Sequence, residues 1–163
     1  MAVALADLVD SLRREVSPPG EDLFPDAVDA DFEGNLQDAF WEARLDGLLE
    51  GYTESGGSVT PSSGSTDLTR DLQQIIVLYA GVRIVRNHLR SLNTLFRSKA
   101  GPVEFETQKS AAVLKSLLDD LHSRRALVLA RLSDVGSSDS YYIDALIARD
   151  ESLAYGDTYW YSG

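Results

Sequence analysis

Residues 67–134 contain two long apolar repeats separated by a single strong break at Gly101 and Pro102. The first repeat places its apolar side chains on one side of a helix, where each residue turns by about 100°. These side chains are Val77, Leu78, Gly81, Val85, Leu89, Leu92, Leu95 and Phe96. Asp67 is a signal for the start of this helix. Gly101 and Pro102 end it, because proline has no amide hydrogen with which to continue the helical hydrogen bonds.

A second helix begins directly after this break. Pro102 suits the first position of a helix, and Glu104 and Glu106 would face the positive end of its dipole. The apolar stripe of this helix consists of Ala111, Leu114, Leu117, Leu118, Leu121, Val128 and Leu132. Because two apolar stripes joined by a short turn can bury each other, the sequence predicts a long antiparallel helical hairpin over residues 67–134.

The first helix of this predicted hairpin has a second patterned face, opposite the first. At helical spacing it carries three apolar residues in its first half and four arginines in its second half. They are Leu72, Ile76, Tyr79, Arg83, Arg86, Arg90 and Arg97. A helix that is apolar on two faces must contact something besides its hairpin partner. Two interpretations follow: the N-terminal helices of the same subunit cover the apolar residues, or the whole face forms an interface between subunits.

The rest of residues 1–134 predicts further helices around the hairpin. Apolar spacing indicates a short helix over residues 2–16 and another over about residues 27–50, although Gly34 and Gly47 make the ends of the latter uncertain. Residues 51–66 are rich in Gly, Ser and Thr and predict a long loop or a loose hairpin, with some strand character at Val59 and Thr60. The expected fold class is therefore all-α, a helical bundle built on the hairpin.

Residues 135–163 are expected to form an extended C-terminal tail that binds a protein surface. Five of the seven tyrosines and one of the two tryptophans lie in this segment. Disordered segments are normally poor in aromatic residues, and Tyr and Trp give a large contact area for little lost rotamer freedom. The candidate anchors are Tyr141, Tyr142, Tyr155, Tyr159, Trp160 and Tyr161.

The net charge of -11 is unevenly distributed. Residues 67–134 carry +4, whereas residues 1–66 carry -11 and residues 135–163 carry -4. This segregation favours pairing between segments or subunits over sequence-independent binding to DNA. The chain has no cysteine, which excludes disulfides and thiolate metal sites. No apolar run approaches the ~18 residues of a membrane span, and the first residues lack the basic start of a signal peptide, so a soluble protein that is not exported is expected.

No catalytic or metal-binding pattern stands out. His88 and His122 have no further ligand at metal-binding spacing, with His88 near the apolar face of its helix and His122 toward the polar side. The paired acids Asp119 and Asp120 point to different sides of a helix, which is poor geometry for acid–base catalysis. The glycines at 56, 57 and 64 are not followed by the lysine of a phosphate-binding loop. The sequence therefore predicts neither an enzyme nor a bound metal or cofactor.

The predicted hairpin resembles the head-to-tail adaptor, or connector, proteins of long-tailed bacteriophages. The resemblance lies in residues 92–106, which include the basic turn of residues 97–102, and in the leucine-rich run of residues 110–121. It covers mainly residues 67–134, less than half of the chain. The resemblance implies a small helical subunit that assembles into a ring, usually of twelve copies. Such a ring docks beneath the portal protein and above the stopper or tail completion protein.

The resulting hypothesis is a structural protein of the virion neck, made and assembled in the host cytoplasm. Its expected partners are further copies of itself, the portal protein, the stopper or tail completion protein, and DNA that passes through the ring without sequence specificity. The aromatic tail would dock on the portal protein or on a neighbouring subunit. The alternative is a small helical nucleic-acid-binding regulatory protein that uses the basic stripe of residues 83–97. The net negative charge of the chain and the lack of aromatic residues among these arginines count against that alternative.

Overall fold

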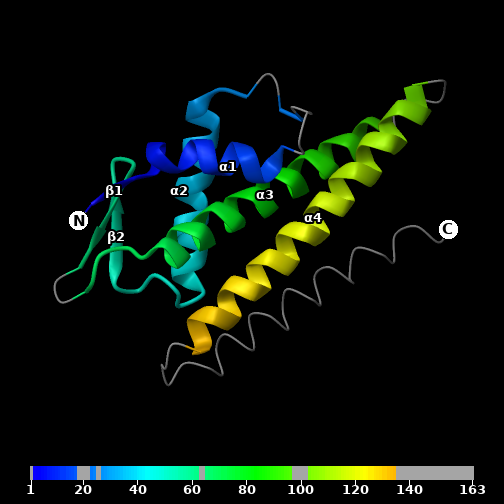
Figure 1. Cartoon of the computed structure of the whole chain (residues 1–163). Helices are drawn as coiled ribbons and strands as arrows, with labels where there is room; N and C mark the ends of the chain where they lie inside the picture. The colour runs from blue at the N-terminus through cyan, green and yellow to red at the C-terminus, as the bar shows by residue number, and fades with distance from the viewer. Residues whose placement is uncertain (1, 18–22, 25–26, 63–64, 97–102, 135–163) are drawn as a thin grey trace.

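The computed structural model describes residues 2–17, 23–24, 27–62, 65–96 and 103–134. This part of the chain is mostly helical and includes a small sheet (Figure 1). In chain order the elements are β1 (Val3–Ala4), the 3-10 helix η1 (Leu5–Leu8), α1 (Val9–Val16), α2 (Asp29–Leu45), β2 (Tyr52–Ser55), β3 (Ser58–Pro61), α3 (Arg70–Phe96) and α4 (Val103–Asp134). The expectation of a mostly helical protein is confirmed, and the small three-stranded sheet is an addition that the all-α prediction did not include.

The sheet forms because the chain turns back sharply at Gly56 and Gly57. These residues have φ angles of 59° and 79°, as in the two-residue turn that matches the twist of antiparallel strands and favours glycine at both positions. β2 and β3 pair across this turn, and β1 adds to the other edge of β3, giving the order β1-β3-β2. The segment expected as a loop or loose hairpin over residues 51–66 thus contains a defined hairpin. The helix expected over residues 2–16 begins instead with a strand and a 3-10 turn.

α2 ends five residues earlier than the apolar spacing indicates. Gly47 adopts a φ of 82°, a left-handed conformation that glycine reaches without a Cβ penalty. The amide of Leu48 then donates a hydrogen bond to the carbonyl oxygen of Ala43 at 3.1 Å, and the amide of Gly47 donates one to the carbonyl oxygen of Arg44 at 3.0 Å. This pair of bonds is the Schellman termination of a helix. It redirects the chain so that Leu49 is buried at the start of the turn into β2.

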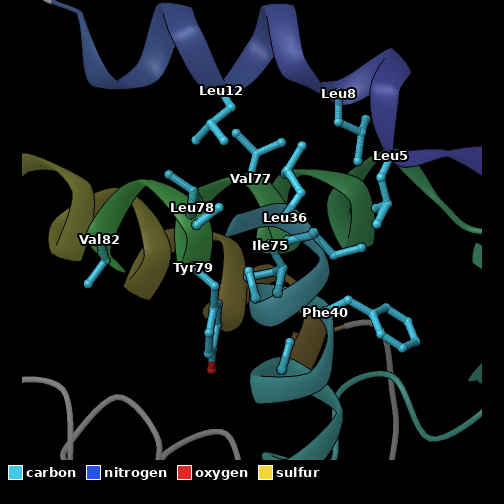
Figure 2. Packing of buried hydrophobic residues seen from close by; sticks show 14 of the residues in the cluster. Leu5, Leu8, Leu12, Leu36, Phe40, Ile75, Val77, Leu78, Tyr79 and Val82 are labelled. Atoms are coloured by element: carbon cyan, nitrogen blue, oxygen red, sulfur yellow. The ribbon is translucent and has the colours of Figure 1, made fainter. Parts of the chain in front are cut away.

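The first half of α3 is the centre of the molecule. Every residue from 75 to 82 is buried, because α1, α2 and α4 all pack against this helix. Figure 2 shows Leu12 of α1 and Val77 of α3 pointing toward each other, while Tyr79 points away from α1. Helices that are apolar on all sides are stable only when they are covered on all sides. The two apolar faces of this helix are therefore explained by burial within one subunit.

α3 and α4 lie along each other, with the chain running in opposite directions along the two helices (Figure 1). Leu114, Leu121, Val128 and Leu129 of α4 are buried in the shared core. α3 begins after Thr69 instead of at Asp67, since the Thr69 hydroxyl accepts a hydrogen bond from the amide of Leu72 at 3.4 Å. The predicted turn between the helices, residues 97–102, lies outside the described residues.

Candidate interaction surfaces

Two of the three apolar residues of the proposed subunit interface lie inside the subunit, and the third is partly covered. Ile76 is 0% exposed and Tyr79 is 3% exposed, and the half-buried Leu72 packs against the same core. Side chains that are already buried have no surface to offer to a neighbouring subunit. For Ile76 and Tyr79, the structure agrees with the first interpretation, in which other segments of the same subunit cover this face of the helix.

Tyr79 belongs to a polar cluster that joins three helices. Its hydroxyl donates a hydrogen bond to Oδ2 of Asp46, just after α2, at 2.8 Å. From α4, the guanidinium carbon of Arg125 lies 4.5 Å from the centre of the Tyr79 ring, which is a cation–π distance. Arg125 is only 7% exposed. Because buried polar groups are costly unless they are satisfied, this cluster fixes the end of α2 relative to α3 and α4.

The arginine stripe is partly used within the subunit. Arg83 forms an ion pair with Asp38 of α2, with 2.6 Å between Nη2 and Oδ2. This contact confirms, for Arg83, the expected pairing between the basic hairpin segment and the acidic N-terminal segment. Arg86 is half-buried and Arg90 is exposed, while Arg97 lies outside the described residues. The geometry therefore does not present the stripe as one free basic surface.

Two further arginines join segments that are distant in the sequence. Arg13 of α1 pairs with Asp29 at 2.8 Å and lies 4.5 Å over the ring of Phe32, both in α2. Arg124 of α4 pairs with Glu15 of α1 and with Asp120 of its own helix. The pKa of Arg124 is raised, first by its hydrogen bond to Asp120 and then by the charges of Glu15 and Asp120, against the opposing effect of partial burial. These pairs orient α1 against the rest of the body.

An exposed apolar surface lies on the outer face of α2. Trp41 is 43% exposed and Leu45 is 87% exposed, and the two residues lie one helical turn apart. With Arg44 and Glu50 they line an open hollow of about 520 Å³. The Arg44 guanidinium lies 5.3 Å from the centre of the Trp41 ring, and the Phe40 ring packs edge-on against that ring at 5.3 Å. We call Trp41, Arg44, Leu45 and Glu50 the α2 patch.

Sequence reasoning missed the α2 patch, although a signal was present. The apolar positions that define the core face of α2 are Phe32, Leu36, Ala39, Phe40 and Ala43. At about 100° per residue, Trp41 and Leu45 fall on the opposite side of the helix. Two large apolar side chains on the side away from the core, four residues apart, indicate a surface that is available for binding.

The histidines differ from expectation in one case. The His88 ring packs edge-on against that of Phe24, with 5.2 Å between ring centres. His122, expected toward the polar side of its helix, is buried beside Leu121. The buried stripe of α4 is thus wider than the leucine spacing indicates. Within the described residues, no group of three or more acidic, histidine or cysteine side chains could hold a metal ion.

The candidate anchors of the tail, Tyr141 to Tyr161, lie outside the described residues. In the part of the chain that the structure describes, no helix is both long enough and apolar enough to cross a membrane. No family model, curated protein or solved structure matches this chain.

Proposed function

We propose that this protein is a structural subunit of a phage neck, a head-to-tail adaptor that assembles into a ring between the portal protein and the stopper or tail. The observation that carries the proposal is the α2 patch. Trp41 and Leu45 are large exposed apolar side chains one helical turn apart, whereas the other large exposed apolar side chains of the described residues, Val28, Val113 and Leu127, do not lie one turn from each other. Exposed apolar surface of this kind is typical of a protein–protein contact.

The sequence pattern supports the same assignment. The segment that resembles the adaptor family falls on the second half of α3 and the first half of α4, the two longest helices of the described structure. Two packed helices of this length form a stiff support whose ends can hold partners at a fixed separation. A helical pair whose shared core is filled by side chains suits a structural role better than it suits a role that requires an open cavity.

The burial of Ile76 and Tyr79 changes where the ring contacts are proposed to lie. The interface cannot use these residues, so it must use surface that remains exposed, such as the α2 patch. Arg86 and Arg90 remain candidates for pairing across an interface, because they are not buried. Ring closure requires a contact between two different surfaces of neighbouring subunits, repeated around an axis.

Electron microscopy of labelled particles tests this assignment. Antibodies raised against the purified protein, carrying gold, would be added to tailed particles from cells that express the chain. We expect label at the neck, between head and tail. Label along the tail fibres or over the capsid surface, or its absence from intact and mildly disrupted particles, would refute the assignment.

Mass photometry of the purified protein gives a second, independent measurement. A ring of twelve chains of 17.8 kDa has a mass of about 214 kDa. We expect this species to appear with rising protein concentration or on addition of portal protein. A regulatory nucleic-acid-binding protein would instead stay small and bind duplex DNA with a steep dependence on salt.

A further inference from the structure

The α2 patch has the size and chemistry of a site for a peptide segment. Two exposed side chains and one open hollow offer a few hundred Å² at most. A standard protein–protein interface needs about 800 Å² from each partner. Two α2 patches in contact would therefore make too small a dimer interface. An extended segment that inserts one or two large side chains into the hollow fits this area.

The position of the patch indicates where such a segment could come from. The hydrogen bond from Tyr79 to Asp46, together with Arg125 over the Tyr79 ring, places the end of α2 beside α4 at the level of Arg125. α4 continues from there to Asp134, roughly 14 Å further along its axis. α2 and the described part of α4 end on the same side of the subunit (Figure 1). The chain therefore continues from α4 into residue 135 on the side of the subunit where α2 also ends.

The chemistry of residues 135–163 complements the patch. This segment carries the aromatic anchors around Tyr141, Tyr155 and Trp160, and its charge is -4. Aromatic side chains give much contact area at a low entropic cost, and Trp41 offers them an exposed ring. Arg44, lying over that ring, offers one positive group to an acidic side chain, and Glu50 balances its charge within the patch, so the aromatic contacts make most of the fit.

The segment is long enough to reach a second copy. Its 29 residues span on the order of 90 Å when fully extended. A body of this size has a radius of gyration of about 14 Å. Contact between the segment of one copy and the patch of the next joins two different surfaces. Contacts of that kind, repeated in one direction, generate rings, whereas a surface that pairs with itself generates only dimers.

We propose that the α2 patch binds the aromatic C-terminal segment of the neighbouring copy of this chain and that this contact links the ring. The inference rests on the proposed ring assembly and names its interface. Trp41 and Leu45 are the receiving side chains, and an aromatic side chain of residues 141–161 fills the hollow beside them. Arg44 pairs with an acidic group that flanks the inserted aromatic residue.

Engineered cysteines in the full chain test this contact, because the natural sequence has no cysteine. Glu50→Cys places a thiol at the rim of the hollow and leaves Trp41 and Leu45 intact. It would be combined, one at a time, with Ser140→Cys, Ser152→Cys or Ser162→Cys, each of which lies within three residues of a tyrosine of the segment. After mild oxidation, non-reducing gels would report the bonds and mass photometry of the same sample would report assembly.

We expect at least one combination to give a ladder of covalently linked copies. Mixing the two single-cysteine variants should give covalent dimers. Adding Trp41→Ser and Leu45→Ser should lower the yield of linked copies about tenfold, as loss of central binding residues does. The matched control is Val28→Cys in place of Glu50→Cys. Val28 is 60% exposed just before the first residue of the same helix, and it should give no ladder.

The possible failures are distinguishable. A bond within single chains, without a ladder, would overturn the inference by showing that the segment binds its own body. Ring-sized particles with no bond, or with equal bonding at position 28, would overturn the inference and leave the ring assembly standing. No species heavier than a monomer, together with no label at the neck, would overturn both the inference and the proposed function.

Discussion

Replacing Gly81 by alanine should stabilise the protein, although this residue lies in the most crowded part of the core. A Cβ added there would lie 3.5 Å from the methyl carbons of Leu121 and 3.5 Å from one of Val16, which is ordinary van der Waals contact. Alanine removes the ~1 kcal/mol penalty of glycine inside a helix. One buried methyl group adds up to ~0.8 kcal/mol. The expected gain for Gly81→Ala is therefore about 1 to 2 kcal/mol.

Gly34→Ala is the matched control, since Gly34 is exposed inside α2 and nothing lies within 4 Å of its added Cβ. Its free energy of unfolding should rise only by the difference in helix propensity between glycine and alanine, about 1 kcal/mol. Gly81→Leu should instead lose ~1 to 3 kcal/mol, because the larger side chain must displace Leu121 and Val16. The free energy of unfolding would be measured by urea titration with circular dichroism, at a concentration low enough to keep the protein monomeric.

The reasoning would be refuted if Gly81→Ala were less stable than the unsubstituted protein while Gly34→Ala gained the expected amount. That result would mean that α1 and α4 approach α3 more closely at position 81 than the 3.5 Å separations indicate. Equal gains at the two positions would assign the whole effect to helix propensity and leave no contribution from packing.

Two other substitutions and one truncation test contacts described above. Tyr79→Phe removes the hydrogen bond to Asp46 but keeps the ring under Arg125, and it should cost about 1 to 2 kcal/mol in a urea titration. A change below about 0.3 kcal/mol would show that the buried cluster does not depend on that bond. Arg83→Met breaks an exposed ion pair and should cost less than about 1 kcal/mol; a larger loss would mean that Arg83 also supports the core. A chain that ends at Gly136 should keep the circular dichroism and stability of the full chain but fail to form ring-sized particles in mass photometry. Assembly of this shortened chain at normal yield would show that the C-terminal segment is not the link.

The long helices were predictable because their apolar side chains repeat over many turns. Val77, Leu78 and Val85 of α3 and Leu114 and Leu121 of α4 are buried as the spacing indicates. What spacing could not decide was which element covers the second apolar face of α3. That choice depends on where α1 and α2 pack, which is set by contacts between residues far apart in the sequence.

The sheet and the buried polar cluster illustrate two other limits. β1 has only two residues, and it becomes a strand because the β2–β3 hairpin provides an edge for it. Periodicity cannot reveal a pairing between Val3 and Val59. Arg125 was counted among the charges of the hairpin, but its aliphatic stem and planar group can be buried when an aromatic ring such as Tyr79 lies beneath it. The local signals of the hairpin were the Gly56-Gly57 doublet and the strand character of Val59 and Thr60.

The segregated charges of this chain serve its own fold before they serve any assembly. Arg13 with Asp29, Arg83 with Asp38 and Arg124 with Glu15 each join segments that are distant in the sequence. Exposed pairs of this kind contribute only ~0.2 to 1 kcal/mol each, so they orient elements that the apolar core holds together.

The salt dependence of ring assembly distinguishes an apolar contact from a charged one. If assembly depends mainly on Trp41 and Leu45, raising the salt concentration should weaken it little, since salt screens charges and leaves apolar contacts intact. If it depends instead on Arg86 and Arg90 meeting acidic groups of a neighbour, assembly should fall steeply between low salt and about 0.5 M, where the Debye length is well under 10 Å. Mass photometry over this salt range, with Arg86→Glu and Arg90→Glu beside Trp41→Ser and Leu45→Ser, separates the two. Loss of assembly in the arginine variants alone, with a steep dependence on salt, would assign the ring contact to the arginines and not to the α2 patch.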